Sequence, residues 1–224
     1  MVKRDNTLFF LKPDATIRPY VGARIMKEIL DSGFVPVAFQ ELDLERDFLI
    51  NHHYAVHKGK FFFDWLIRYV SLHPAVALII EGNDIIPELR RILGPTFPEK
   101  AALEAPNSMR ARYGIFGGVN GCHASDSENA AASEIASWHS RGYLKPAGNA
   151  TQLAQSYIEE HIDSPYIDSI RYRELSQMLA SNPVTKPLVH EKFRELLTEE
   201  TRKNGSRLIE AFADSLVMNS LLGR

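Results

Sequence analysis

Apolar residues in the first two thirds of the chain recur with the spacing of strands and helices in turn. Short apolar or alternating runs, typical of strands, occupy residues 7–11, 34–44, 74–81 and 113–116. Helical spacing is found at residues 20–32, 46–71, 84–93 and 128–137, and residues 94–109 form a long irregular stretch. With the small helices set aside, the order β-α-β-β-α-β predicts an α+β fold of the ferredoxin-like type, in which helices cover the faces of an antiparallel sheet.

Only helical patterns follow residues 142–148, where the composition shifts. Apolar stripes predict four helices there, which start near residues 153, 167, 188 and 208. The stripes are apolar enough to pack either on the first part of the chain or on another subunit. We therefore divide the chain into a first region at residues 1–143, which carries all the candidate chemistry, and an all-helical extension at residues 144–224.

Composition and charge exclude several classes of protein. The net charge of -2 provides no overall basic field, so we expect no nucleic-acid partner. Cys122 is the single cysteine, which excludes a disulfide within the chain and argues against a cysteine-based metal cluster. No apolar run approaches the roughly 20 residues that span a bilayer, and the N-terminus does not have the pattern of a signal peptide. We expect a cytoplasmic protein without membrane contact.

The strongest candidate for chemistry is the segment 120–127, Asn-Gly-Cys-His-Ala-Ser-Asp-Ser, with His123 at its centre. Ser125 and Glu128 have the spacing of a capping box, which predicts that a helix begins just after the histidine. An imidazole beside a helix N-terminus is well placed for an anionic group such as phosphate, and its lone pair can act as a nucleophile. The alternative is a histidine in an ordinary loop between a strand and a helix.

Cationic and aromatic residues elsewhere favour the chemical interpretation. Lys12 follows the first strand, and Arg91 and Arg110 frame the long irregular stretch. Three cations near a nucleophilic histidine suit a polyphosphate, because phosphoryl transfer depends on charge neutralisation and alignment. The aromatic run 61–63 suits a surface that stacks on a base. The alternative is that the arginines make surface ion pairs and the phenylalanines belong to the core.

Four motifs occur in succession: Leu-Lys-Pro-Asp at 11–14, Arg-x-x-Gly-x-Thr-x-Pro at 91–98, Ser-x-Arg-Ala at 108–111 and Asn-x-x-His-x-Ser-Asp-Ser at 120–127. Together they resemble the nucleoside diphosphate kinase family over residues 7–143. The resemblance implies a ping-pong transfer of the γ-phosphate of a nucleoside triphosphate to a nucleoside diphosphate through a phosphohistidine. The motifs are closer to a divergent branch with some weakly active members. A nucleotide-binding scaffold that acts through its helical tail is therefore the alternative.

The resemblance also implies a role for each matching residue. His123 would accept the phosphate, Glu134 would hydrogen-bond the other imidazole nitrogen, and Ser125 would support them. Lys12 would contact the sugar and the terminal phosphate, with Tyr54 beside it. The nucleotide-binding set would be Arg91, Thr96 and Arg110 at the outer phosphates, His57 at the α-phosphate, Lys12 and Asn120 at the ribose, and Phe62 and Leu66 at the base.

The partners that the resemblance implies are nucleoside di- and triphosphates. Magnesium would arrive with the nucleotide and be bound mainly by phosphate oxygens, so no protein residue is assigned as a metal ligand. Asp14 and Asp126 would be structural or would steady a magnesium-bound water. Family members assemble from dimers, so the resemblance also implies a homo-oligomer.

Several positions depart from the family's pattern. Ala124 stands where glycine usually follows the histidine, which would cost about 1 kcal/mol or more if the position required a positive φ. Arg112 stands where aspartate is common, and Lys60-Phe61 replaces an Arg-Pro pair. The stretch from Arg91 to Arg110 is also longer than in the commonest form of the family.

Overall fold

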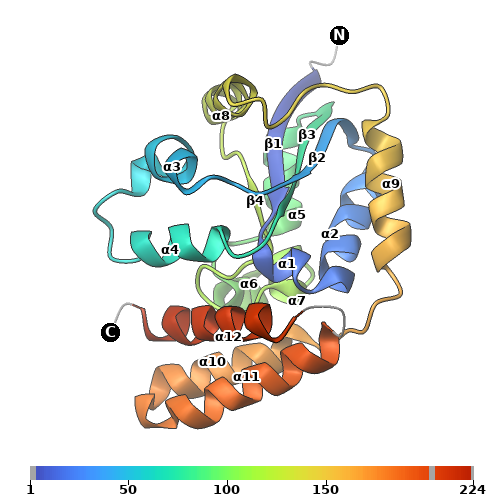
Figure 1. The fold of residues 1–224 in the computed structure, drawn as a ribbon. Helices are drawn as coiled ribbons and strands as arrows, with labels where there is room; N and C mark the ends of the chain where they lie inside the picture. Colours follow the sequence, from blue (N-terminus) through green and yellow to red (C-terminus); the bar gives the residue numbers. More distant parts are fainter. Residues whose placement is uncertain (1–3, 202–204, 223–224) are drawn as a thin grey trace.

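The computed structural model describes residues 4–201 and 205–222 (Figure 1). Its described strands are β1 (Arg4–Leu11), β2 (Val35–Leu42), β3 (Ala75–Asn83) and β4 (Cys122–Ala124). They form one antiparallel sheet in the order β2-β3-β1-β4. This is the ferredoxin-like arrangement, so the predicted α+β fold is confirmed.

The sheet separates two hydrophobic cores, and the period-two alternation of β1 supplies both of them. Leu8 and Phe10 belong to one core, and Phe9 and Leu11 belong to the other. Helices α2 (Pro19–Asp31) and α5 (Ile85–Leu93) cover the Phe9 side, and α4 (Phe63–Val70) covers the Phe10 side. The remaining described helices of the first region are α1 (Pro13–Thr16), α3 (Arg46–Phe48), α6 (Pro98–Glu104), α7 (Met109–Tyr113) and α8 (Glu128–Ser140), with a π-helical turn at Leu49–His53 and a 3-10 turn at Ala55–His57.

The strand predicted at residues 113–116 is wrong. α7 runs to Tyr113, and Phe116 forms only an isolated bridge with Val119. Glycines lie between Tyr113 and Phe116 and between Phe116 and Val119, which favours a turn over a strand. The fourth strand is instead the three-residue β4, which carries His123. The stretch predicted to be irregular also contains α6, which begins at a proline as helices often do.

The helix predicted after His123 begins at Glu128, but its cap is Ser127 and not Ser125. The Ser127 hydroxyl accepts a hydrogen bond from the backbone N–H of Ala130 at 3.2 Å. The predicted capping box is therefore wrong. Ser125 is buried and its hydroxyl is used elsewhere in the site.

The described part of the extension contains four helices, as predicted, and they pack on the first region (Figure 1). α9 (Ala150–His161) lies against α2 and β2. The other three form a bundle at the lower end of Figure 1, below α4, α6 and α7. They are α10 (Ser169–Ser181), α11 (Lys186–Glu200) and α12 (Ser206–Leu221), with a 3-10 turn at Pro183–Thr185.

A buried ion pair joins the extension to the first region. Arg18 Nε donates to Glu200 at 2.8 Å, and both side chains are fully buried. The guanidinium also donates to the Ile167 carbonyl at 2.8 Å and to the Ser169 hydroxyl at 3.1 Å. Its carbon lies 4.6 Å from the ring centre of Tyr172, whose hydroxyl donates to Glu200 at 2.7 Å. The charge of Arg18 is thus neutralised inside the extension.

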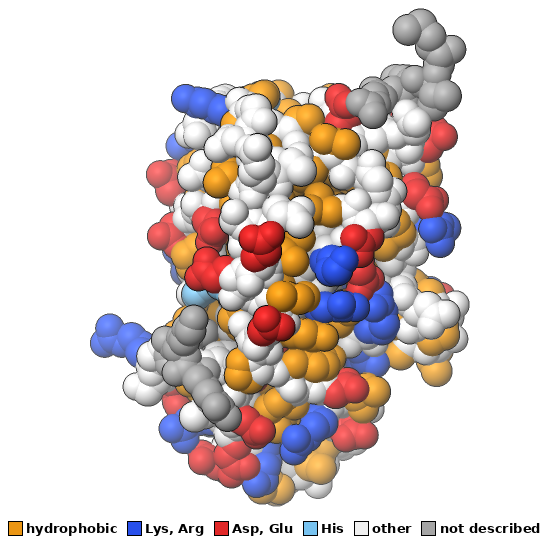
Figure 2. All heavy atoms as spheres, turned by 90° about the vertical axis from the view of Figure 1, so that its right-hand side faces the viewer, with side chains coloured by type: hydrophobic (Ala, Val, Ile, Leu, Met, Phe, Trp, Pro, Cys, Tyr) orange, Lys and Arg blue, Asp and Glu red, His pale blue; other side chains and the backbone are white. Residues whose placement is uncertain are grey.

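Figure 2 shows the face that α9 covers, where acidic and basic side chains lie beside one another with apolar side chains between them. The described helices include none with the length and apolar character needed to cross a membrane.

Candidate active site

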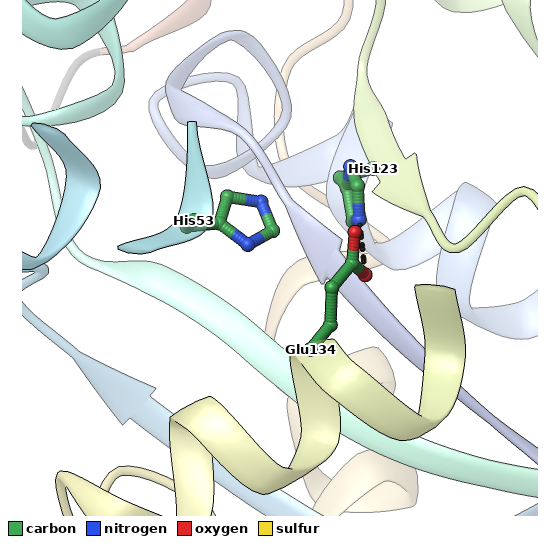
Figure 3. A group of neighbouring side chains, drawn as sticks. All are labelled: His53, His123 and Glu134. Carbon is green, nitrogen blue, oxygen red and sulfur yellow. Dashed lines mark hydrogen bonds and ion pairs between the residues drawn. The ribbon is translucent and has the colours of Figure 1, made fainter. Parts of the chain in front are cut away.

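His123 lies in the middle of β4, where its backbone pairs with Phe10 of β1. Its Nε2 lies 2.9 Å from Oε2 of Glu134, which projects from α8 (Figure 3). The same carboxylate oxygen accepts a hydrogen bond from the Ser125 hydroxyl at 2.8 Å. The side chains of His123 and Glu134 are 19% and 21% exposed, so the pair is shielded from bulk water and still accessible to a ligand.

The contact with Glu134 decides which imidazole nitrogen is available. A carboxylate only accepts hydrogen bonds, so the neutral ring of His123 carries its proton on Nε2 and keeps a lone pair on Nδ1. That lone pair can attack phosphorus, and the carboxylate behind the ring stabilises the positive charge that then develops. The imidazole also stacks on Phe10, with ring centres 5.0 Å apart, which restricts its rotation.

His53 is a neighbour of His123 that the sequence analysis missed. The two ring centres are 4.6 Å apart, with the planes at 76°. The indole N–H of Trp138 donates to Nδ1 of His53 at 3.3 Å. Burial, followed by the charges of His123 and Lys12, lowers the pKa of His53 well below its usual value, so the ring is neutral.

The proton of His53 therefore lies on Nε2, because Nδ1 is an acceptor. Nε2 has no hydrogen-bond partner among the described residues, although His53 is buried. A buried donor without an acceptor is costly, which makes it a candidate contact for an incoming oxygen. The one sign in the sequence that His53 belongs to the site was its position directly before Tyr54.

Lys12, Asn120 and Thr96 form a connected group. Lys12 Nζ donates to Asn120 Oδ1 at 2.9 Å, and Asn120 Nδ2 donates to the Thr96 carbonyl at 2.8 Å. Burial, and then the charge of Arg110, lowers the pKa of Lys12 to about 8. The nearby charge of Asp14 raises the pKa of Lys12 but does not outweigh its burial. A bound phosphate would add further negative charge beside the ammonium.

Arg110 acts on Lys12 through its charge, whereas Arg91 is engaged in an ion pair elsewhere. Arg110 is buried and its Nη1 donates to the Gly94 carbonyl at 3.0 Å. Arg91 instead pairs with Glu88 at 2.5 Å, and its side chain is 69% exposed. Burial lowers the pKa of Arg110, and among the neighbouring charges that of Cys122 raises it while that of Arg90 lowers it. Arg90 is therefore a second candidate for the cationic position that the sequence analysis gave to Arg91, since the pattern did not distinguish two adjacent arginines.

Asp14 supports the loop that precedes His123. Its Oδ2 accepts from the backbone N–H of Gly121 at 2.8 Å, and the Tyr69 hydroxyl donates to Oδ1. Gly121 has a φ of +85°, which residues with a side chain rarely adopt. Asp14 is fully buried, and that burial raises the pKa of its carboxyl. Asp126 is exposed and accepts a hydrogen bond from the neighbouring Ser127 hydroxyl.

Tyr54, His57 and Phe62 lie together in the segment before α4. The ring centres of Tyr54 and His57 are 6.0 Å apart, and those of His57 and Phe62 are 5.6 Å apart. Tyr54 is buried, which raises its pKa, and its hydroxyl has no hydrogen-bond partner in the described part of the chain. Burial, and then the charge of Lys60, lowers the pKa of His57. Phe62 is half-buried and Leu66 is buried, so Phe62 offers an accessible ring.

Two departures from the expected pattern are accommodated locally. Ala124 lies in β4, and among the described non-glycine residues only Asp84 has a positive φ, so the alanine is not strained. Arg112 pairs with both carboxylate oxygens of Glu28 and lies 4.8 Å from the ring centre of Tyr113.

The described residues contain two groups of side chains that could hold a metal ion, with three ligand atoms within 4.8 Å of one another. Both include a histidine nitrogen, whereas magnesium prefers oxygen ligands. The cations Lys12 and Arg110 suit phosphate oxygens, so the chemistry of this site fits magnesium carried by a nucleotide. The two groups are His53, His123 and Glu134 at the site, and His190, Glu210 and Asp214 on the extension.

Known proteins match the first region. The family model described as nucleoside diphosphate kinase matches residues 5–143. The nucleoside diphosphate kinase of Streptomyces avermitilis is 40% identical over 130 residues, which are 58% of this chain and 92% of the relative. The enzyme of that name from Aquifex aeolicus is 37% identical over 131 residues, with 58% and 91% of the two chains covered.

Solved structures agree with the sequence matches. The Aquifex aeolicus nucleoside diphosphate kinase superposes with a TM-score of 0.57 at 36% identity, covering 60% of this chain and 94% of that chain. The Halobacterium salinarum nucleoside diphosphate kinase, solved in complex with CDP, gives a TM-score of 0.59 at 28% identity and covers 70% and 99%. Since the family model matches more than half of the sequence and these relatives are covered almost completely, the chain belongs to the nucleoside diphosphate kinase family.

Proposed function

We propose that His123 carries the phosphoryl group in the nucleoside diphosphate kinase reaction of this chain. The hydrogen bond between its Nε2 and Glu134 supports this proposal, because it leaves the Nδ1 lone pair as the nucleophile. Nδ1 would attack the γ-phosphorus of a nucleoside triphosphate, forming an N–P bond while the bond to the β-phosphate oxygen breaks. A terminal oxygen of a second nucleoside diphosphate would then attack the same phosphorus and break the N–P bond.

Cationic side chains would neutralise and align the phosphates. Lys12 and Arg110 are buried cations with lowered pKa values. The negative charge of a bound phosphate would raise these pKa values and stabilise both cations. We assign the third cationic position to Arg90 and not to Arg91, because Arg91 is paired with Glu88. Phosphoryl transfer depends on such positioning more than on covalent chemistry by the protein.

The sugar and the base would lie beside the hydrogen-bonded group of Lys12, Asn120 and Thr96. Asn120 would contact the ribose while it orients Lys12, with Thr96 next to it. Phe62 would stack on the base, with Leu66 beneath it. Stacking on an aromatic ring tolerates any base, which fits a broad nucleotide range. Tyr54 and His57 would also line the nucleotide site, and His57 would reach the α-phosphate.

Magnesium would enter as part of the nucleotide and would neutralise phosphate charge there. Residues 1–143 would form the catalytic region, with residues 144–224 as its extension. We also predict a homo-oligomer and a cytoplasmic location, in keeping with the family resemblance and with the single, buried Cys122.

Incubation with ATP and GDP tests the proposal. The wild-type chain should form GTP and an acid-labile phosphoenzyme, and the His123→Ala variant should form neither while keeping its thermal stability. Undiminished GTP formation by His123→Ala would remove this residue from the mechanism. A wild-type chain that binds nucleotides and forms no GTP would favour the scaffold alternative.

A further inference from the structure

The segment 111–121 links two proposed nucleotide contacts, Arg110 and Asn120, and leads to His123. Its backbone is held by side chains of the extension. Arg173 of α10 donates through Nη2 to the carbonyls of Ala111 and Gly114, each at 2.8 Å, and through Nε to that of Ile115 at 3.2 Å. Ser169 donates to the Tyr113 carbonyl, which lies between those of Ala111 and Gly114, at 2.9 Å.

Asn219 of α12 holds the turn in the same segment. Its Nδ2 donates to the Phe116 carbonyl at 2.7 Å, and its Oδ1 accepts from the backbone N–H of Gly118 at 3.2 Å. Asn219 is 5% exposed, so both bonds are made away from water. A Cβ on Gly118 would lie 2.7 Å from the Trp65 ring, so the turn is packed tightly between α12 and α4.

A second set of contacts connects α12 to the segment 111–121 through residues of α4. The indole N–H of Trp65 donates to the Ser215 carbonyl at 3.0 Å. Tyr69, one turn further along α4, packs on Phe212, with ring centres 6.5 Å apart. The hydroxyl of Tyr69 donates to Asp14, which in turn holds the N–H of Gly121.

A displacement of this segment would reach the nucleotide contacts directly. Asn120 is the acceptor for Lys12 Nζ and the donor to the Thr96 carbonyl. A shift of the Asn120 backbone would therefore move the partner of a buried cation, and distortions of about 1 Å are enough to weaken binding or catalysis markedly. The family match ends at residue 143, so this support is supplied by the part of the chain beyond it.

We propose that the extension is a built-in part of the nucleotide site, and that Asn219 is a positioning residue that fixes the segment 111–121 so that Asn120 and Lys12 meet the nucleotide. This rests on the function proposed above. Asn219 touches no reacting atom; it acts through the Phe116 and Gly118 backbone.

Three variants of the full chain separate positioning from simple stability. Asn219→Leu keeps the approximate size and removes both hydrogen bonds, and Asn219→Asp keeps the acceptor for Gly118 and removes the donor to Phe116. Val189→Ala is the control, because it opens the buried packing of α11 without touching the segment. The readouts are the Kd for ADP, KM and kcat with ATP and GDP, and the thermal midpoint.

Asn219→Leu should raise the ADP Kd and the nucleotide KM by about tenfold. This corresponds to part of the free energy of one to two buried hydrogen bonds being lost from nucleotide binding. Asn219→Asp should give at least as large a rise, because its buried carboxylate faces the Phe116 carbonyl without a proton to share. Val189→Ala should lower the midpoint with Kd and KM unchanged. If Asn219→Leu binds ADP like the wild type, or if Val189→Ala weakens binding equally, the proposal is overturned. Should Asn219→Leu not fold, Asn219→Asp decides by the same comparison. A wild-type chain without turnover refutes the proposed function, and the ADP Kd still decides the role of Asn219.

Discussion

Trp138 donates its indole N–H to Nδ1 of His53, across 85 positions of sequence. The bond fixes the tautomer of a buried, neutral histidine whose ring lies 4.6 Å from that of His123. The opposite nitrogen, Nε2, then carries a hydrogen-bond donor with no acceptor in the described part of the chain. A phosphoryl oxygen on or near His123 would satisfy it.

We expect His53→Phe to lower kcat by about a hundredfold to a thousandfold, the effect of losing one donor to developing negative charge. Trp138→Phe should have a smaller effect in the same direction, because it frees the tautomer and leaves the imidazole in place. Single-turnover formation of the phosphoenzyme measures both. Full activity in His53→Phe would show that Nε2 does not contact the transferring group.

The depressed pKa of Lys12 predicts a pH dependence. Its ammonium is charged below a pKa of about 8 and neutral above it, so the phosphate-binding charge is lost as the pH rises. The kcat/KM for ATP reports the free enzyme and should fall above about pH 8, by up to about tenfold per pH unit. Lys12→Arg keeps its charge throughout this range, so its profile should lack this descending limb. A limb near pH 8 that persists in Lys12→Arg would assign it to another group.

Arg90 and Arg91 offer a matched pair of variants. Arg90→Ala should raise the KM for nucleotides by about tenfold or more, as expected for a charge-assisted contact to phosphate. Arg91→Ala should change KM by less than about twofold, because it loses only an exposed ion pair with Glu88. Steady-state kinetics with ATP and GDP measure both, and the opposite ranking would restore Arg91 to the site.

The buried pair of Arg18 and Glu200 should dominate the attachment of the extension. Glu200→Ala leaves the guanidinium buried without its carboxylate, which should lower the free energy of unfolding by roughly 3–5 kcal/mol. Lys192→Ala, which breaks an exposed pair with Glu195, is the control and should cost no more than about 1 kcal/mol. Denaturant unfolding measures both; equal small losses would mean that this ion pair does not dominate the attachment of the extension.

The sequence predicted the fold well because the runs that form β1 and β3 are buried on both faces and stand out as continuous apolar segments. The motifs also predicted a set of polar residues that the structure brings together through hydrogen bonds, as with Lys12 and Asn120. A three-residue strand such as β4 leaves too short a pattern to detect.

The rest depended on three-dimensional relationships that spacing does not contain. Adjacent helical residues point about 100° apart, so the choice between Arg90 and Arg91 requires the rotation of α5. The environment of His53 depends on Trp138, a contact between distant segments. The replacement of Ser125 by Ser127 as the helix cap likewise follows from the course of the backbone after β4.

The central claim is that Glu134 holds Nε2 of His123 and leaves Nδ1 as the acceptor of phosphate. The most direct measurement is the position of the phosphoryl group on the ring, by phosphorus NMR or mass spectrometry of the phosphoenzyme formed from ATP. The account predicts phosphorylation of Nδ1 at residue 123, with none in His123→Ala. Phosphate on Nε2 of that ring, or on another residue, would contradict it.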